Sequence, residues 1–274
     1  QHTILVEDYN FHIIYMAIRI TISVEVLFGT HVKNHAPNQY LCRMEKRRKK
    51  AQPILEGVTI TDVAAEGKSL ARVDDMVLFI PFGAPGDIVD VQIRSKKRNF
   101  MEGNIIHFHT KSGLRREPFC EHFGTCGGCK WQHLPYSLQA DYKRQHVIDS
   151  LERIGGFRGV AVAPVIVSPQ ETHYRNKLEY TFSDRRWLTG EELPESGERP
   201  EVNFNGLGFH LPGQFDRILD INMCHLQPEP SNSIRLFVKS AAEDLKIPFF
   251  NQRRHEGNLR NLIIRNNKKG EFMV

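Results

Sequence analysis

The stretch that decides the fold begins at Val58-Thr-Ile-Thr-Asp-Val63. A second and a third run rich in β-branched residues follow at 77–80 and 88–93, and a fourth run lies at 101–108. Such runs favour short strands, and turn residues such as Glu66-Gly67-Lys68 and Pro85-Gly86-Asp87 mark the connections between them. About five strands within about 55 residues predict a small β-barrel of the oligonucleotide-binding type.

Positive charge is concentrated in the same part of the chain. The 274 residues carry a net charge of +5, and residues 44–116 hold all of this excess, with fourteen basic and nine acidic side chains. Clustered positive charge attracts polyanions through counterion release, so we predict an RNA-binding face; a solvated surface without a partner is the alternative. The candidate residues of this face are Lys68, Arg94, Lys96, Lys97 and Arg98.

The composition is typical of a globular protein of the cytoplasm. Hydrophobic residues make up 40% of the chain and charged residues 25%. Five cysteines are few and odd in number, which argues against a secreted disulfide framework and favours a reducing compartment. The most apolar segment, 11–28, contains His12, Arg19 and Glu25, which are costly in a bilayer. We therefore expect no membrane span. We also expect a monomeric protein.

Three of the five cysteines lie in one glycine-rich stretch, Phe119-Cys-Glu-His-Phe-Gly-Thr-Cys-Gly-Gly-Cys-Lys-Trp-Gln-His133. Thiolates this close repel one another unless a metal neutralises them, so the C-x5-C-x2-C spacing predicts a metal or iron–sulfur site. Gly127-Gly128 would let backbone amides approach the sulfides of a 4Fe–4S cluster. A structural zinc site is the alternative, although zinc ligands usually come as two C-x2-C pairs.

A site of this kind needs a fourth ligand in addition to Cys120, Cys126 and Cys129. Cys224 follows the apolar run Ile218–Met223 and precedes a predicted helix, where a side chain can be held rigidly. Cys42 lies in the atypical N-terminal segment. We therefore predict Cys224 as the fourth ligand, and a buried structural cysteine is the alternative.

The remainder of the chain combines helix and strand signals, which gives an α+β fold class. A helix is predicted over 136–154, because apolar residues recur with helical spacing and Gly155-Gly156 follows. Leu259–Arg265 is predicted as a strand, and the turn residues at 266–270 connect it to a second strand that begins at Glu271.

Both ends of the chain are atypical. Residues 1–43 lack turn residues and are unlike the rest of the sequence, whereas Met44 opens a basic run typical of an N-terminus. We interpret Met44 as the natural start and 1–43 as a segment foreign to the native protein; a genuine N-terminal extension is the alternative. The predicted hairpin stops inside its second strand, so we expect the chain to be a fragment of a longer protein.

The motifs resemble those of a known family. The pattern Ile60-Thr-Asp-Val-Ala-Ala-Glu-Gly-Lys68, followed by Val77-Leu-Phe-Ile-Pro81 and Pro85-Gly-Asp87, resembles a TRAM domain, an RNA-binding barrel attached to RNA-modifying enzymes. Together with the cysteine stretch and the distant Cys224, it resembles the iron–sulfur branch of the RNA (uracil-5-)-methyltransferase family. Most characterised cluster-bearing members of that family act on 23S ribosomal RNA.

The resemblance runs from Met44 to Val274 and implies three regions. They are a TRAM-like barrel at 44–110, an iron–sulfur loop with a helix at 111–160, and a central α/β domain at 161–274, cut before a Rossmann-like domain that binds S-adenosylmethionine. Arg175, Asn176 and Lys177 sit at the entry to a predicted strand and are further RNA-binding candidates, because this motif lies near the RNA-facing cleft in the family. Ribosomal RNA is the expected partner, and transfer RNA is an alternative.

The resemblance also implies a reaction whose key groups are missing from this sequence. In the family, a cysteine adds to C6 of uracil, C5 takes a methyl group from S-adenosylmethionine, and a base removes the C5 proton. Four of the cysteines here are assigned to the cluster, and no strand–glycine loop–helix unit binds S-adenosylmethionine. We therefore predict no catalytic residue in this chain and no activity of the chain alone.

Two other functions compete with this one. The first is a stand-alone RNA-binding module with a structural four-cysteine metal site. The second is a radical methylthiotransferase, which also pairs a cluster with a TRAM barrel. That enzyme class uses a C-x3-C-x2-C loop, and the x5 spacing here argues against it.

Overall fold

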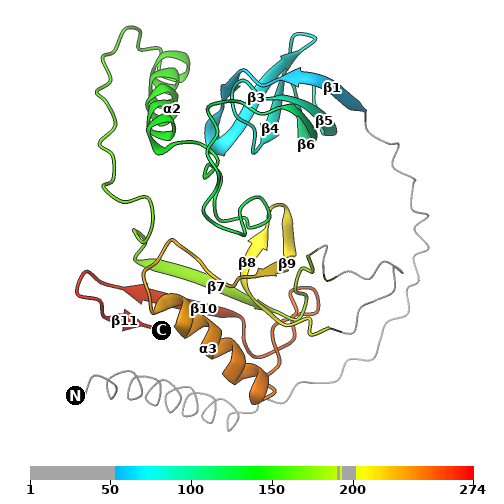
Figure 1. Cartoon of the computed structure of the whole chain (residues 1–274), viewed down its shortest axis with the longest axis vertical. Helices are drawn as coiled ribbons and strands as arrows, with labels where there is room; N and C mark the ends of the chain where they lie inside the picture. The colour runs from blue at the N-terminus through cyan, green and yellow to red at the C-terminus, as the bar shows by residue number, and fades with distance from the viewer. Residues whose placement is uncertain (1–52, 190–191, 193–201) are drawn as a thin grey trace. The chain divides into compact units, whose positions relative to one another are not determined.

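A computed structural model describes residues 53–189, 192 and 202–274 of the chain (Figure 1). The predicted extension 1–43, Cys42 and the basic run after Met44 lie outside the described residues. The described part contains two sheets, one in its N-terminal and one in its C-terminal half.

The first sheet has six strands in the order β1-β5-β6-β4-β3-β2. Their bounds are β1 (Ile54–Thr59), β2 (Asp62–Val63), β3 (Lys68–Val73), β4 (Met76–Pro81), β5 (Ile88–Lys96) and β6 (Phe100–Thr110). β4 and β6 pair in parallel, and the other neighbours are antiparallel. β1 and β2 are the two edges of the sheet, yet only Ile60 and Thr61 separate them in the chain. Since a residue spans at most about 3.5 Å, the two edges must meet, and the sheet curls into the predicted barrel.

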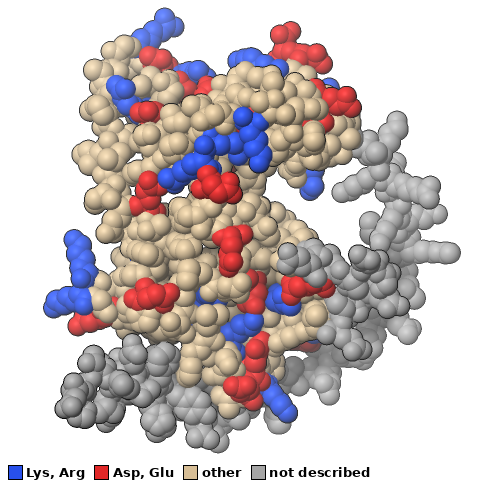
Figure 2. Space-filling model, in the orientation of Figure 1, with Lys and Arg blue, Asp and Glu red and all other residues tan. Residues whose placement is uncertain are grey.

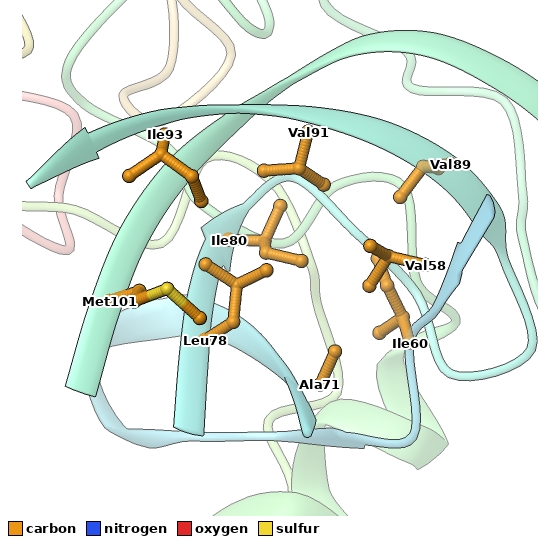
Figure 3. Close-up of a cluster of buried hydrophobic side chains, with 9 residues drawn as sticks. All are labelled: Val58, Ile60, Ala71, Leu78, Ile80, Val89, Val91, Ile93 and Met101. Carbon is orange, nitrogen blue, oxygen red and sulfur yellow. The ribbon is translucent and has the colours of Figure 1, made fainter. Parts of the chain in front are cut away.

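Strand alternation builds the core of this barrel (Figure 3). On β5, Val89, Val91 and Ile93 point inward and are at most 1% exposed, whereas the residues between them are only partly buried. The buried core consists of Val58, Ile60, Ala71, Leu78, Ile80, Val89, Val91, Ile93 and Met101. The sequence-based expectation of strands at 77–80, 88–93 and 101–108 is confirmed.

Two details of the barrel differ from the expectation. The run 58–63, expected as one strand, is divided between β1 and β2. Lys68, expected in a turn, begins β3, whose inward residues are the small side chains of Ser69 and Ala71. Small inward residues give a weak strand signal, which is why the sequence does not predict β3.

Asp87 ties the turn before β5 to the segment that leaves the barrel. Its carboxylate, which is fully buried, accepts hydrogen bonds from the backbone N–H groups of Ala84 (2.7 Å) and Ser112 (2.8 Å). The guanidinium of Arg115 forms an ion pair with it at 2.6 Å. Burial alone would raise the pKa of Asp87, but the hydrogen bonds from Arg115, Ser112 and Ala84 lower it.

Two α-helices lie in the described part. α2 (Tyr136–Asp149) continues into one π-helical turn, η2 (Ser150–Ile154), and ends at Gly155, which confirms the helix expected over 136–154. α3 (Ser231–Asp244) follows the loop that carries Cys224. Among the described residues, neither helix is long and apolar enough to cross a membrane.

The second sheet has five strands in the order β11-β10-β7-β8-β9. Their bounds are β7 (Lys177–Ser183), β8 (Gly206–Leu211), β9 (Gln214–Asp220), β10 (Asn261–Asn266) and β11 (Phe272–Met273). All of its pairs are antiparallel, and the β10–β11 hairpin confirms the turn expected at 266–270. α3 lies against this sheet (Figure 1). The guanidinium of Arg235, on α3, lies over the ring of Tyr180, on β7. The region predicted as a central α/β domain is therefore an antiparallel sheet with one helix, in agreement with the α+β class.

Candidate metal centre

The cysteine stretch is a chain of turns without helix or strand. The N–H of Phe123 donates to the carbonyl of Cys120 (3.0 Å), and the N–H of Cys126 donates to the carbonyl of His122 (2.9 Å). The N–H of Gly128 donates to Sγ of Cys126 at 3.3 Å. This amide meets a cysteine sulfur, and the predicted approach of the glycine amides to the sulfides of a cluster stays a prediction.

Residues of the stretch attach it to the barrel. His133 is 2% exposed, and its Nε2 contacts the carbonyl of Gly83, just after β4, at 2.9 Å. The ring of Phe123 packs edge-on against Phe82, with 5.4 Å between centroids. Within the stretch, the buried Gln132 accepts a hydrogen bond from the N–H of Cys120 (3.3 Å). The side of the stretch that carries Cys120 is therefore fixed to the barrel.

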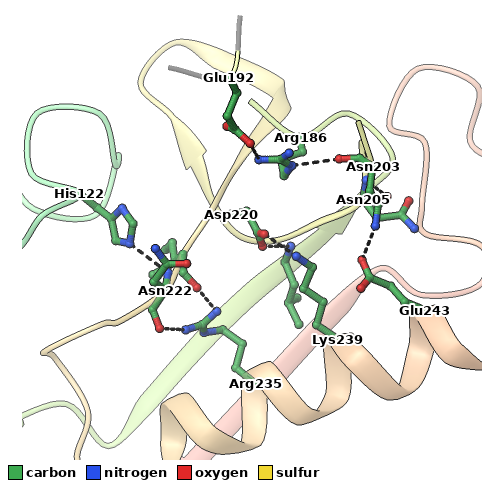
Figure 4. Close-up of polar contacts among 12 residues, drawn as sticks. His122, Arg186, Glu192, Asn203, Asn205, Asp220, Asn222, Arg235, Lys239 and Glu243 are labelled. Atoms are coloured by element: carbon green, nitrogen blue, oxygen red, sulfur yellow. Dashed lines mark hydrogen bonds and ion pairs between the residues drawn. The ribbon is translucent and has the colours of Figure 1, made fainter. Parts of the chain in front are cut away.

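Other residues attach the same stretch to the second sheet. The N–H of Gly127 donates to the carbonyl of His210 on β8 at 3.1 Å. Any side chain at Gly127 would collide there, because its Cβ would lie 2.5 Å from that carbonyl oxygen. His122 accepts the backbone N–H of Asn222 at Nε2, at 3.0 Å (Figure 4). The stretch therefore bridges the barrel and the second sheet.

Cys224 lies in the loop between β9 and α3 and is 8% exposed. The side chain of Asn232, on the first turn of α3, forms hydrogen bonds with both the N–H and the carbonyl of Cys224. The N–H of Cys224 donates to Oδ1 of Asn232 (2.8 Å), and Nδ2 of Asn232 donates to the carbonyl of Cys224 (3.2 Å). This reciprocal pair fixes the cysteine at the place where the sequence predicted a rigid ligand.

The structure brings the four predicted ligands together. Cys120, Cys126, Cys129 and Cys224 all line one small cavity, and all four are free thiols. The other lining residues are His122, Phe123, Gly128, Gln132, Phe209, Ile221, Met223, His225 and Leu226. No carboxylate of the described residues lines the cavity, and Nε2 of His122 is occupied by Asn222. The possible metal donors of this cavity are therefore the four cysteines and His225, in largely apolar surroundings, and four cysteines fit an iron–sulfur cluster or zinc.

The electrostatics of the cavity disfavour free thiolates. Burial raises the pKa of Cys126 to about 11, and the neighbouring Cys129, Cys224 and Cys120 add to this effect. Burial also raises the pKa of Cys120 and of Cys224. Since a bound cation deprotonates coordinating thiols, a metal would reverse this preference.

A single-ion geometry is not preformed. Among residues 53–189, 192 and 202–274, no group of three or more His, Cys, Asp or Glu side chains is arranged around one metal-ion position. In a four-iron cluster each cysteine binds a different iron, so its ligands surround a larger group than one ion. The metal-binding role of the four cysteines stays a prediction.

The basic candidates on the barrel are solvent-accessible. Arg94, Lys96, Lys97 and Arg98 are exposed, at the end of β5 and in the turn to β6. Lys68 differs from them, because it forms an ion pair with Glu102 on β6 (3.1 Å). Figure 2 shows a group of Lys and Arg side chains on one face of the molecule, over the barrel.

The second group of RNA candidates belongs to the other sheet. Arg175 and Asn176 are exposed just before β7. Lys177, the first residue of β7, forms an ion pair with Glu179 at 3.1 Å. The RNA candidates therefore lie on two separate sheets, and their contacts with RNA stay a prediction.

Sequence reasoning missed three residues that organise the cavity. His122 and His133 do not fall at metal-ligand spacing in the sequence, and the structure shows that they connect the stretch to its neighbours. Arg235 is the largest fully buried side chain of the described part. An arginine in a predicted helix carries no local signal of burial, so the sequence offers no way to find it.

The chain is similar to several known proteins. The sequence profile of the TRAM domain matches residues 56–106, within the span from β1 to β6. An uncharacterised RNA methyltransferase of Porphyromonas gingivalis is 51% identical over 219 residues, which are 78% of this chain and 47% of that protein. A protein of the same description from Bacteroides thetaiotaomicron is 48% identical over 212 residues, 77% of this chain and 46% of that protein.

One solved structure is also similar. It is the crystal structure of the Pyrococcus abyssi tRNA (uracil-54, C5)-methyltransferase in complex with S-adenosyl-L-homocysteine, with a TM-score of 0.52 and 26% identity. The match covers 79% of this chain and 44% of that chain. The present chain thus spans about half the length of the relatives it matches. It contains a TRAM domain and is homologous, over that half, to bacterial proteins named RNA methyltransferase.

Proposed function

We propose that this chain is the RNA-binding and iron–sulfur half of an RNA (uracil-5-)-methyltransferase that modifies a uridine of 23S ribosomal RNA. Homology to proteins named RNA methyltransferase and the likeness to a tRNA (uracil-54, C5)-methyltransferase support the reaction class. The TRAM domain supports RNA as the substrate. The family that the cysteine spacing resembles supports ribosomal RNA, and transfer RNA is the alternative substrate.

The observation that carries the iron–sulfur part is the convergence of four cysteines from two distant segments on one cavity. Apolar side chains, including Phe123 and Phe209, line the same cavity and would screen a cluster from water. We propose that Cys120, Cys126, Cys129 and Cys224 hold a 4Fe–4S cluster. With all four positions filled by cysteine, the cluster would be structural and would join the barrel-bound stretch to the loop before α3.

The RNA-binding part rests on exposed cations. Arg94, Lys96, Lys97 and Arg98 are exposed, and the described residues include no acidic side chain that forms an ion pair with them. Phosphate groups could therefore bind these cations directly. Arg175 and Asn176 would add contacts to phosphates or to unpaired bases from the second sheet. We also propose that the regions 44–110, 111–160 and 161–274 act as the RNA-binding barrel, the cluster-binding segment and the central domain.

The methyl-transfer chemistry is assigned to the part of the relatives that this chain does not span. S-Adenosylmethionine would supply the methyl group there, and a cysteine outside the four cavity thiols would attack the uracil ring. A thiol that ligates a cluster cannot also be the nucleophile. This half of the protein would bind and orient the RNA so that the target base can leave its stack.

The reading frame that follows Val274 and an activity assay test this proposal together. A frame that continues into a strand–glycine loop–helix unit with a later cysteine supports the enzyme. Its full product should form 5-methyluracil in unmodified 23S ribosomal RNA with S-adenosylmethionine, whereas the present chain alone should form none. A stop codon after Val274, with metal and RNA binding by the chain, would instead favour the stand-alone RNA-binding module.

A further inference from the structure

Arg235 is a buried cation that forms no ion pair with any carboxylate of the described residues, although Asp220 acts on it at longer range. It lies on α3, and its side chain is 0% exposed. The carboxylate of Asp220 is bound by Lys239, one turn further along the same helix (Figure 4). Removing a charge from water costs several kcal/mol unless other groups compensate it, so an unpaired buried guanidinium requires an explanation.

The groups that contact this guanidinium are neutral. Its two terminal nitrogens donate to the carbonyl of Ile221 and to the carbonyl of Asn222, the latter at 2.9 Å. Its carbon lies 5.4 Å from the ring centroid of Tyr180. Nε of Arg235 has no hydrogen-bond partner among the described residues. These contacts solvate the positive charge without neutralising it.

The two carbonyls that Arg235 binds belong to the loop that leads into the wall of the cysteine cavity. Ile221 and Cys224 line the cavity, and Asn222 donates its N–H to His122 on the opposite segment. Oδ1 of Asn232, which accepts the N–H of Cys224, is also 3.5 Å from a terminal nitrogen of Arg235. Arg235 therefore lies directly behind the loop that presents Cys224.

We propose that Arg235 is the buried counter-cation of a negatively charged metal–thiolate centre in this cavity. The proposal rests on the metal centre proposed above. Four thiolates outweigh the positive charge of a 4Fe–4S core, and they outweigh that of a zinc ion as well, so either centre is an anion. In apolar surroundings a nearby cation stabilises such an anion strongly. Arg235 acts as a positioning residue. It fixes the 221–224 loop and supplies a positive charge that offsets the net negative charge of the metal–thiolate centre.

The test compares Arg235→Gln and Arg235→Lys with the wild-type chain, each prepared metal-loaded and metal-free. Arg235→Gln keeps a hydrogen-bond donor but removes the charge, so we expect it to lose metal to a chelator about tenfold faster. Arg235→Lys keeps the charge, so its rate should stay within about threefold of wild type. Lys246→Gln, which removes an exposed cation just beyond the end of the same helix, is the matched control and should retain metal like wild type.

Two further measurements separate a charge effect from a packing effect. With iron bound, Arg235→Gln should shift the reduction potential to a more negative value, because a cation favours the reduced, more negative cluster. Arg235→Lys should leave the potential close to that of wild type. In thermal unfolding, Arg235→Gln should destabilise the loaded form more than the metal-free form. Equal destabilisation of both forms would mean ordinary packing and would overturn the proposal.

The outcomes distinguish this inference from the proposed function. A wild-type chain that binds neither iron nor zinc defeats the metal centre, and the inference with it. A wild-type chain that binds metal, alongside an Arg235→Gln variant with unchanged retention, overturns the inference alone. If Arg235→Gln does not fold, Arg235→Lys decides: retention within about threefold of wild type supports the proposal, and tenfold faster loss overturns it.

Discussion

The barrel and the cysteine stretch are stabilised in different ways. The barrel closes six hydrogen-bonded strands around nine buried hydrophobic residues, all contributed by its own segment. The cysteine stretch has no strand or helix. It is held by hydrogen bonds to the carbonyl of Gly83, beside the barrel, and to the carbonyl of His210, on the second sheet. At its centre lies a cavity lined by thiols rather than a packed core. A segment of this kind depends on its neighbours and, on our proposal, on a metal.

The sharpest way to separate the two regions is Cys126→Ser. Cys126 is a predicted ligand, and an alcohol is a poor substitute for a thiolate, so we expect nearly all bound metal to be lost. Cys126 is not part of the buried core of the barrel, so RNA binding through Arg94–Arg98 should persist. Metal analysis and an RNA titration on the same preparation measure both effects. Thr125→Ser, one residue earlier, is the control and should keep its metal.

The reverse experiment disturbs the barrel and leaves the cysteines alone. Asp87→Asn removes the charge that pairs with Arg115 in a buried setting, and we expect a loss of about 3 kcal/mol in the free energy of unfolding. Urea unfolding of both proteins measures this loss. A change below about 0.5 kcal/mol would show that the pair contributes little beyond its hydrogen bonds.

The same residue gives the barrel a pH dependence. The pKa of Asp87 is lowered in the folded state, so its contribution is present above the pKa of an unfolded aspartate, about 4, and is lost as the pH falls through the folded value. Wild type should therefore lose stability on acidification below about pH 4, and Asp87→Asn should lose less over the same range. Identical pH profiles for the two proteins would contradict this role.

The basic stretch tests whether the barrel, rather than the second sheet, provides most of the RNA affinity. Replacing Arg94, Lys96, Lys97 and Arg98 with alanine should weaken RNA binding about tenfold at low salt and flatten its salt dependence. Replacing Lys268 and Lys269, which are exposed in the β10–β11 turn, is the control and removes half as many charges. Equal losses per charge removed in both variants would indicate general charge attraction without a defined RNA-binding face.

The smallest expected effect comes from the contact of the cysteine stretch with the second sheet. Gly127→Ala would place a Cβ 2.5 Å from the carbonyl oxygen of His210 and push the stretch away from β8. We expect metal retention to fall roughly fivefold, equivalent to about 1 kcal/mol of strain. Gly113→Ala is the control, since no atom lies within 4 Å of its added Cβ. Equal retention in the two variants would show that the stretch tolerates displacement.

The barrel and the surroundings of the cysteine cavity also differ in how far the sequence predicts them. The barrel was largely predictable, because alternating residues such as Val89, Val91 and Ile93 encode a strand locally. β3 was missed, since Ser69 and Ala71 are small and Lys68 resembles a turn residue. The gathering of four cysteines was expected from their spacing and number. The residues that surround the cavity were not, because the burial of Arg235 depends on tertiary contacts that no local pattern records.

On our proposal, three cysteines of one loop and the distant Cys224 hold one iron–sulfur cluster. The most direct test is metal and sulfide analysis of the chain purified without oxygen, beside Cys224→Ser. We predict about four iron and four sulfide per wild-type chain, with the visible absorbance of a cluster that decays in air, and the loss of this cluster in Cys224→Ser. Stoichiometric zinc without iron, or a full cluster in Cys224→Ser, would contradict the account.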